Sequence, residues 1–239
     1  MEAFYKEKFT LTPMQVDRFG RATPAALLYL VQEAAGQHCA LLKVDHDTLS
    51  HKHLFWAVTR NRVQISRLPR LGETVYVETW PMPTTRVAYP RSVVAYDENH
   101  KELFRSISLW VLMDSRTRGM ILPGKSGIIV NGTLTGTELT APHAIATRPM
   151  EHSVTRTVGY TLLDRNGHMN NTRYMDWVYD LLPSVFHESH PVQEFTVCYL
   201  NEAREGDAIH LSYDLSDGPL FTVDAQREGN RIFSAQMQF

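Results

Sequence analysis

The sequence predicts an α+β fold in which one structural unit occurs twice. Each half of the 239-residue chain holds a segment with apolar residues at helical spacing, followed by strand-like runs that turn residues separate. The halves also keep the same order of short motifs. This repetition indicates two copies of one supersecondary unit.

The first half opens with a predicted helix. Thr23 can cap it and Pro24 suits its first turn. Residues then recur at helical spacing along one face, at Leu27, Leu30, Val31, Ala34, His38 and Leu41. Strand-like runs follow at residues 55–65, 73–80, 86–96 and 102–113, with turn signals such as Pro69 and Gly72 between them.

The second half repeats this order. Asn170 or Asn171 can cap a helix that Pro183 limits, and its apolar face carries Tyr174, Trp177, Val178 and Leu181. Strand-like runs follow at residues 194–200, 208–215, 220–226 and 231–239, and "REGN" at 227–230 is typical of a hairpin turn. Residues 124–149 are rich in Gly, Thr and Pro and have little amphipathic pattern, so they indicate a linker with one short turn of structure.

The two halves align without gaps at two motifs. "VDRFGRATPAALLYL" aligns with "LDRNGHMNNTRYMDWV", which pairs Asp17 with Asp164 and Gly20 with Gly167. "LPRLGETVYV" aligns with "NEAREGDAIHL", which pairs Gly72 with Gly206. Identity is low, but the order of elements is kept.

A helix followed by long antiparallel strands packs best when a twisted sheet wraps the helix and buries its apolar stripe. This is the hotdog arrangement, and two copies can pair their sheets edge to edge. We therefore predict a double hotdog with two long helices, divided into an N-terminal hotdog at 1–128, a linker at 129–147 and a C-terminal hotdog at 148–239. The alternative is a pair of unrelated α+β modules.

Composition narrows the class of protein. The chain is 43% hydrophobic and 21% charged, which is typical of a folded soluble protein. Its apolar runs are far shorter than the ~20 residues of a membrane span, and its first residues lack signal-peptide features. We expect a cytoplasmic protein without membrane insertion. Two cysteines exclude a disulfide framework or a four-thiolate zinc site, and the scattered arginines do not favour nucleic-acid binding.

Charge is unevenly distributed between the halves. Residues 1–128 hold 17 Lys and Arg against 12 Asp and Glu, whereas residues 129–239 hold 7 against 14. This asymmetry either has no functional meaning or gives the first half a basic face for an acidic partner.

The second half carries polar residues where the first does not. Asp164, Asn166 and His168 stand at alternate positions before the second helix, whereas the first half has Asp17, Phe19 and Arg21 there. Alternate residues of an extended segment point the same way, so the three side chains can line one wall. The helix start that follows offers backbone N–H donors for an oxyanion. The pattern predicts chemistry at a carbonyl group.

These residues resemble a known family. "DRNGHMNNTRYMDWV" is similar to the D-x-N-x-H-x-N-N-x-x-Y-x-x-W signature of the acyl-acyl carrier protein thioesterases, the FatA/FatB type of plant plastids and their bacterial relatives. "RSISLWVLMDSRTRGMILP" resembles the family's Ser-x-Trp-Val-x-Met run and Thr-Arg pair, and "PRLGETVYVETWP" is also similar. The resemblance implies a thioesterase that releases fatty acid from acyl carrier protein and so ends chain elongation in fatty acid biosynthesis.

By position, the resemblance makes Asp164, Asn166, His168 and Glu202 the catalytic candidates. Ala203 stands where many members carry cysteine, so a Cys–His–Asn scheme is not possible there. We predict that Glu202, alone or with His168, activates a water as general base, while Asn166 and backbone N–H groups hold the oxyanion. Asp164 either orients its neighbours or attacks directly to give a mixed anhydride.

The rest of the predicted site follows more indirectly. The resemblance implies an acyl tunnel in the first hotdog, which Trp56, Leu109 and Trp110 could line. The basic first half suggests Arg60, Arg62, Arg67 and Arg70 as docking residues for an acidic carrier protein. We expect no metal and no cofactor, and a monomer or homodimer.

Two other functions remain open from the sequence. The chain could be another hotdog enzyme that acts on acyl-CoA, by hydrolysis or by dehydration of a hydroxyacyl thioester. It could also be a non-catalytic module that binds acyl thioesters, although binding an acyl tail does not require the polar trio.

Overall fold

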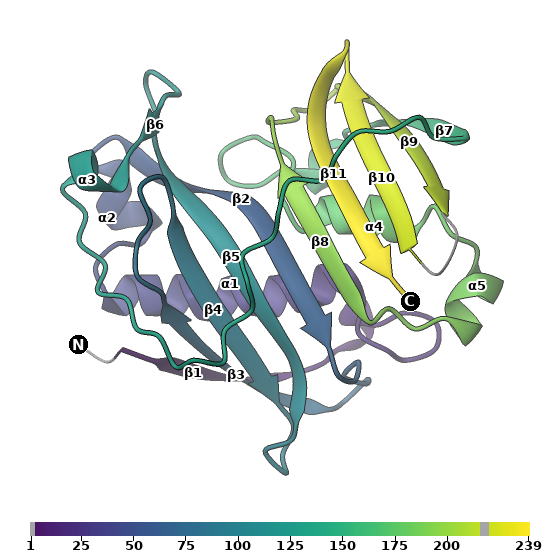
Figure 1. Ribbon diagram of the computed structural model, residues 1–239, viewed down its shortest axis with the longest axis horizontal. Helices are drawn as coiled ribbons and strands as arrows, with labels where there is room; N and C mark the ends of the chain where they lie inside the picture. The colour runs from purple at the N-terminus through teal and green to yellow at the C-terminus, as the bar shows by residue number, and fades with distance from the viewer. Residues whose placement is uncertain (1–2, 216–219) are drawn as a thin grey trace.

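The computed structural model describes residues 3–215 and 220–239 and shows the repeated unit that the sequence predicts (Figure 1). The first half contains β1 (Tyr5–Thr10), η1 (Pro13–Gln15), α1 (Pro24–Leu41), α2 (His46–Ser50), β2 (Leu54–Ile65), β3 (Thr74–Pro81), β4 (Tyr89–Tyr96), β5 (Glu102–Asp114), β6 (Met120–Ile121) and α3 (Pro123–Ser126). The second half contains β7 (His152–Thr157), η2 (Tyr160–Leu162), α4 (Arg173–Tyr179), α5 (Ser184–Ser189), β8 (Glu194–Tyr199), β9 (Ala208–Leu215), β10 (Leu220–Arg227) and β11 (Asn230–Gln238).

All of these strands belong to one antiparallel sheet. Its order is β1-β3-β4-β5-β2-β8-β11-β10-β9-β7, with β6 paired to β5. The two halves join where β2 pairs with β8, from Arg60 opposite Cys198 to Gln64 opposite Glu194. The prediction of a double hotdog with edge-to-edge sheets is therefore confirmed, and the join removes one exposed edge from each half.

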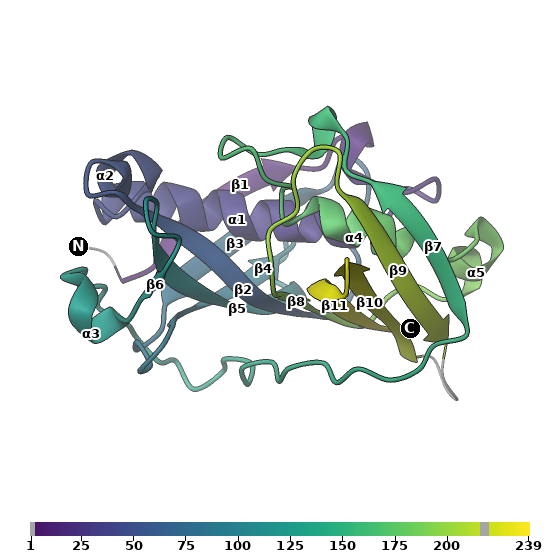
Figure 2. The same ribbon diagram turned by 90° about the horizontal axis from the view of Figure 1, so that it is seen from above.

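The helices α1 and α4 lie on one face of the sheet and the linker crosses the other (Figure 2). The predicted cap of α1 is present, because the Thr23 hydroxyl accepts from the Ala26 backbone N–H at 3.2 Å. Leu27 and Leu28 of α1 are fully buried in a core that extends into the second half. Burial of this apolar stripe is the main source of stability for the first half.

The second helix is shorter than predicted. α4 ends at Tyr179, and Pro183 precedes a separate short helix, α5, so the continuous long helix of the prediction is wrong. The Asn170 side chain accepts from the Thr172 backbone N–H at 2.9 Å just before the helix, while the N-cap position, Thr172, has no side-chain cap. Proline at 183 stops helical hydrogen bonding and restricts the residue before it, which explains the break.

The sequence analysis missed the edge strands β1 and β7 and the two-residue strand β6. β1 and β7 open the halves and pair at the outer edges of the sheet, β1 with β3 and β7 with β9. In β1, exposed and half-buried residues alternate as "YKEKFT". Edge strands carry charged residues because one side remains solvated, and this weakens the apolar signal that identifies a strand.

The linker lies against the outer face of the sheet. Residues 127–151, all of them described, form no helix or strand between α3 and β7. The Thr133 backbone N–H donates to the Pro81 carbonyl at 2.9 Å. Gly132 approaches the neighbouring loop so closely that a Cβ there would lie 2.1 Å from the carbonyl carbon of Met82. Only glycine fits at this contact.

Gly132→Ala should therefore displace the linker from the β3–β4 loop and destabilise the fold by about 1–3 kcal/mol, the usual cost of overpacking. Thermal unfolding and limited proteolysis across residues 129–147 measure both effects. Gly124→Ala is the matched control, since an added methyl there meets open space. Equal melting temperatures and cleavage rates for the two variants would show that the contact does not hold the linker.

None of the helices in residues 3–215 and 220–239 is both long and apolar enough to span a bilayer. Within the same residues, His, Cys, Asp and Glu side chains do not gather in groups of three or more that could hold a metal ion.

Candidate active site

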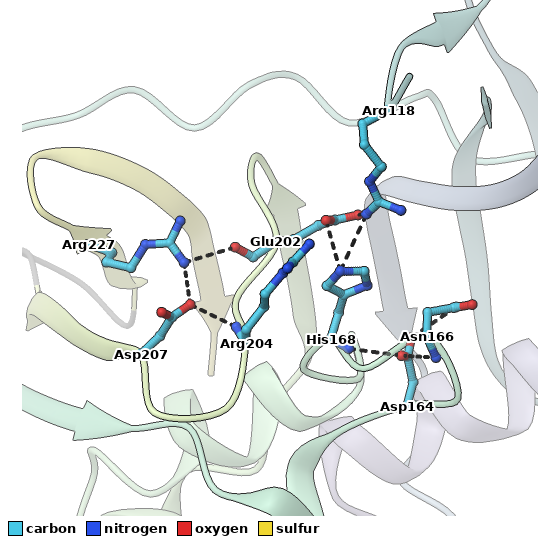
Figure 3. Close-up of polar contacts among 8 residues, drawn as sticks. All are labelled: Arg118, Asp164, Asn166, His168, Glu202, Arg204, Asp207 and Arg227. Carbon is cyan, nitrogen blue, oxygen red and sulfur yellow. Dashed lines mark hydrogen bonds and ion pairs between the residues drawn. The ribbon is translucent and has the colours of Figure 1, made fainter. Parts of the chain in front are cut away.

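The polar trio forms a tight loop held by the Asp164 carboxylate. Its Oδ1 accepts from the backbone N–H of Asn166 at 2.8 Å and of His168 at 3.2 Å, and its Oδ2 accepts from the Asn166 side chain at 3.4 Å (Figure 3). The Asp164 backbone N–H donates to the His168 carbonyl at 2.7 Å. Gly167 closes the loop at φ +75°, a conformation that glycine adopts without strain.

The first half contains the same loop. Asp17 Oδ1 accepts from the backbone N–H of Phe19 at 2.9 Å and of Arg21 at 3.0 Å, and Gly20 has φ +72°. The Asp17 backbone N–H also donates to the Arg21 carbonyl at 2.7 Å. The aspartate and the glycine are therefore parts of the repeated scaffold, and what differs is the pair of side chains that the loop presents.

A second pair of turns extends the correspondence. The Met169 backbone N–H donates to the Ala203 carbonyl at 2.8 Å, and the Ala22 backbone N–H donates to the Pro69 carbonyl at 2.8 Å. Glu202 precedes Ala203 as Leu68 precedes Pro69. The second half thus replaces Phe19, Arg21 and Leu68 by Asn166, His168 and Glu202.

These replacements bring an imidazole and a carboxylate together. His168 Nε2 lies 3.1 Å from Glu202 Oε2 (Figure 3), although the residues are 34 positions apart in the chain. The His168 side chain is 12% exposed and that of Glu202 is 42% exposed. The imidazole is therefore the inner member of the pair, and the carboxylate is the one that reaches solvent. Such a pair can take a proton from a bound water and pass it on.

A third residue, Arg118, completes the cluster, and the sequence analysis missed it. Arg118 ion-pairs with Glu202 Oε1, and its Nη2 lies 3.4 Å from His168 Nε2 (Figure 3). It comes from the β5–β6 turn of the first half, where it has φ +58°. Its guanidinium also stacks 4.9 Å from the Phe55 ring. In the sequence, the only indication of Arg118 was the Thr-Arg pair in "SRTRG", which is part of the resemblance to the thioesterase family.

Arg118→Ala should lower kcat/KM about tenfold or more, because a hydrogen bond to a charged group contributes roughly 1.5–3 kcal/mol. Arg118→Lys should restore little, since lysine lacks the planar fork that holds a carboxylate. Added guanidinium ion should rescue the alanine variant, which a merely structural loss would not show. Arg116→Ala, in the same turn, is the control. Full activity of Arg118→Ala would remove Arg118 from the site.

The turn that carries Glu202 is held by a separate set of contacts. Asp207 Oδ2 accepts from the Arg204 backbone N–H at 2.8 Å and ion-pairs with Arg227 (Figure 3). Arg227 also reaches the Glu202 carbonyl at 3.5 Å. These contacts fix the backbone of Glu202, so that its side chain is directed toward His168.

At the start of α4, three of the backbone N–H groups that the sequence suggested as oxyanion donors already have partners. The backbone N–H groups of Asn170, Thr172 and Arg173 donate to Leu162 O, Asn170 Oδ1 and Asn170 O. The helix has only seven residues, so its dipole is small. The Asn166 carboxamide has two N–H donors, of which the contact with Asp164 uses one. Asn166 is therefore the better candidate for the oxyanion.

The cluster lies at the mouth of a cavity of about 550 Å³ that both halves form. β2 and β5 contribute an apolar wall, and the loop at 164–168 and the segment at 199–202 contribute the polar one. Tyr174 also lines it. Burial is the largest cause that raises the pKa of the Tyr174 phenol, so it remains a neutral hydroxyl at neutral pH.

Of the residues proposed to line an acyl tunnel, two reach this cavity. Trp56 and Trp110 line it and also line a second cavity of about 490 Å³ between α1, β2 and β4. Leu109 lines neither of the two cavities. A role of Leu109 in an acyl tunnel stays a prediction.

The four arginines suggested for docking do not gather at the mouth. Arg60 donates to the Pro142 carbonyl at 3.0 Å and Arg62 ion-pairs with Glu194 at 2.8 Å, so both are held beneath the linker. Arg67 ion-pairs with Glu73 at 2.5 Å. Arg67 and Arg70 follow the C-terminal end of β2, whereas Phe55–Thr59 of its first half line the cavity. The cation at the mouth is Arg118.

The two cysteines are not placed for nucleophilic chemistry in this cluster. Cys198 is buried on β8, and its thiol contacts the His143 carbonyl of the linker at 3.7 Å, on the far side of the sheet. Burial raises the pKa of the Cys198 thiol, which disfavours the thiolate. Cys39 lines the second cavity, away from His168.

Comparison with known proteins identifies both halves. Residues 2–122 match the model of the acyl-ACP thioesterase N-terminal domain, and residues 148–239 match that of the acyl-ACP thioesterase C-terminal domain. The chain is 26% identical to a dodecanoyl-[acyl-carrier-protein] hydrolase of Cinnamomum camphora, over 90% of this chain and 60% of the relative. It is 25% identical to oleoyl-acyl carrier protein thioesterase 1 of Arabidopsis thaliana, over 86% of this chain and 62% of the relative. The chain thus spans about 60% of the length of these relatives.

Two solved structures share the fold. An acyl-ACP thioesterase from Bacteroides thetaiotaomicron superposes with a TM-score of 0.89 at 24% identity, covering 99% of this chain and 98% of that one. The 12:0-ACP thioesterase from Umbellularia californica superposes with a TM-score of 0.85 at 24% identity, covering 100% of this chain and 97% of that one.

Proposed function

This chain belongs to the acyl-ACP thioesterase family, and from that premise we propose that it hydrolyses fatty acyl thioesters of acyl carrier protein and releases free fatty acid, which ends chain elongation. The observation that carries the proposal is the His168–Glu202 pair at the mouth of a cavity with one polar and one apolar wall. A thioester fits with its carbonyl at the polar wall and its alkyl chain along the apolar one.

The proposed reaction begins with a water between Glu202 and the thioester carbonyl. Glu202 takes a proton from the water, whose oxygen forms the new C–O bond. The Asn166 side chain donates a hydrogen bond to the oxyanion that develops. Collapse of the tetrahedral intermediate breaks the C–S bond, and the proton held by the Glu202–His168 pair passes to the departing thiolate. A carboxylate has about four lone-pair positions, so contacts with Arg118 and His168 leave room for the water.

The loop geometry favours an orienting role for Asp164 over nucleophilic attack. Both of its oxygens accept hydrogen bonds within the loop. Asp17 holds the corresponding loop in the first half, where the trio is absent. Since an aspartate holds this loop in both halves, the structural role alone explains why Asp164 is present.

The proposed protein partner is acyl carrier protein, with its acidic surface near the cavity mouth. Arg118 lines the catalytic cavity and Arg165, in the catalytic loop, lines the second one. Arg165 lies 3.8 Å from Asp47 with both side chains largely exposed, so this ion pair is weak and can be exchanged for a carboxylate of the partner.

The deciding experiment offers the same acyl groups, C8 to C18, on acyl carrier protein and on coenzyme A. The proposal expects release of free thiol and free acid, with higher kcat/KM on the carrier protein. Faster hydrolysis of the coenzyme A esters would favour an acyl-CoA thioesterase. An enoyl product without free thiol would indicate a dehydratase, and binding without turnover would indicate a non-catalytic module.

A further inference from the structure

The second cavity continues the catalytic one along α1. Gln32, Trp56 and Trp110 line both, so the two tryptophans form the boundary between them. Their indole N–H groups are turned to the protein, Trp56 to the Val44 carbonyl and Trp110 to the Ser108 hydroxyl, each at 2.8 Å. The rings therefore present apolar faces at this boundary, where an alkyl chain can pass.

The wall of the second cavity contains a buried arginine. Arg91, on β4, is only 6% exposed and lines the cavity together with Tyr89, Pro90 and Cys39. Its Nη1 donates to His38 Nδ1 at 3.1 Å and to Thr79 Oγ1 at 3.2 Å, and its Nη2 lies 3.7 Å from Cys39 Sγ. A guanidinium can only donate, so Nδ1 of His38 is the acceptor in this contact.

In the part of the chain that the structure describes, this guanidinium has no carboxylate counter-ion. Across residues 3–215 and 220–239, no carboxylate forms an ion pair with Arg91. The three contacts account for three of the five N–H donors of a guanidinium, and the acceptors are an imidazole, a hydroxyl and a thiol. Buried charges are ordinarily paired, because an unpaired one is costly. Burial also lowers the pKa of the Arg91 guanidinium, which reflects the same cost.

A plain alkyl chain does not explain a charged group at this place. The methyl end of such a chain cannot accept a hydrogen bond. Packing it beside the guanidinium removes water from the charge and provides no hydrogen bond in exchange. An oxygen atom in the cavity would accept from the remaining donors and offset that cost.

We propose that the second cavity is a subsite for an oxygen atom, as hydroxyl, keto or carboxylate, on the distal part of the acyl chain, and that Arg91 binds this oxygen. The inference rests on the proposed function, because it assumes that the chain enters from the catalytic cavity past Trp56 and Trp110. The substrates that such a subsite would bind are oxygenated acyl thioesters, a narrower class than ordinary fatty acyl thioesters.

The experiment compares pairs of acyl carrier protein substrates of equal length, C8 to C16, one with a terminal methyl and one with a terminal hydroxyl. The wild-type chain should hydrolyse the hydroxylated member with a kcat/KM at least equal to that of its partner at one or more lengths. Arg91→Met should lower that ratio about 10- to 100-fold, the effect of losing a hydrogen bond to a charged donor. Analogues with a keto group on the penultimate carbon or a carboxylate at the terminal carbon then identify which oxygen is preferred.

Two controls keep the result interpretable. Arg86→Met, an exposed arginine just before β4, should leave the ratio unchanged. If Arg91→Met does not fold, Arg91→Lys and the wild-type length series still decide, because a cavity that only accepts alkyl chains disfavours the hydroxyl at every length. A wild-type preference for the methyl chain throughout the series would overturn the subsite.

Affinity for the free acids separates this inference from the proposed function. Calorimetric binding of a hydroxylated acid and of its unsubstituted partner requires no turnover. Tighter binding of the hydroxylated acid by wild type, lost in Arg91→Met, supports the subsite even if none of the thioesters is hydrolysed, in which case only the proposed function fails. Equal or weaker binding of the hydroxylated acid at every length counts against the subsite alone.

Discussion

Glu202→Ala should lower kcat on acyl-acyl carrier protein by about 10²-fold or more, because general-base catalysis contributes roughly that much. His168→Ala should have an effect of similar size, since it removes the group that holds Glu202 Oε2 at 3.1 Å. The double variant should lose little more than either single variant, as expected for residues that act as a unit. Steady-state rates with purified substrate measure all three.

The chain provides a control for Glu202 in the same turn. Glu205 is exposed, and Glu205→Ala removes an equal charge three residues away without touching the cluster. Its kcat should equal that of wild type. Near-normal turnover in Glu202→Ala would reject Glu202 as the base and leave His168 as the remaining candidate.

Asp164→Ala should also lower kcat by about 10²-fold, because the loop that positions Asn166 and His168 loses three hydrogen bonds. Asp164→Asn should retain most of the activity. An asparagine oxygen can still accept from the backbone N–H groups of Asn166 and His168, whereas an amide cannot attack the thioester. The two variants therefore separate an orienting carboxylate from a nucleophilic one.

Asp17→Ala is the matched control for the loop. It removes the same hydrogen bonds from the first half, together with the ion pair to Arg21 at 3.0 Å. It should destabilise the protein but leave kcat near wild type. If Asp164→Asn were as inactive as Asp164→Ala, and hydroxylamine trapped an acyl group on the wild-type enzyme, Asp164 would be the nucleophile.

The internal repeat explains why the polar trio could be found in the sequence, whereas Glu202 was assigned from the resemblance to the thioesterase family. Asp164 and Gly167 have partners in Asp17 and Gly20 that build the same loop, so they belong to the fold. Asn166, His168 and Glu202 replace Phe19, Arg21 and Leu68, so folding does not require them. A repeated scaffold thus acts as its own reference, in which polar differences mark the chemistry.

Other features could not be read from the sequence. Arg118 lies 84 positions from Glu202, and no periodicity relates a hairpin turn of one half to a loop of the other. The four arginines suggested for docking were chosen only because they are positively charged. In the structure, Arg60 and Arg62 on β2 lie under the linker, and the other two follow the C-terminal end of β2. The end of α4 and the edge strands β1 and β7 were also predicted poorly. Intrinsic helix and strand propensities are weak, and the tertiary context decides where such short elements begin and end.

The sequence by itself determined the two-fold architecture, because apolar spacing at helical and strand periods sets which faces are buried, and burial selects one packing. It also determined the loop residues, because their hydrogen bonds join neighbours in the chain. Only the tertiary structure decided how the halves meet at β2 and β8, that Arg118 reaches Glu202, and that Arg91 lies in a cavity wall. Those contacts join residues far apart in the chain, and their geometry follows from the packing of the whole sheet.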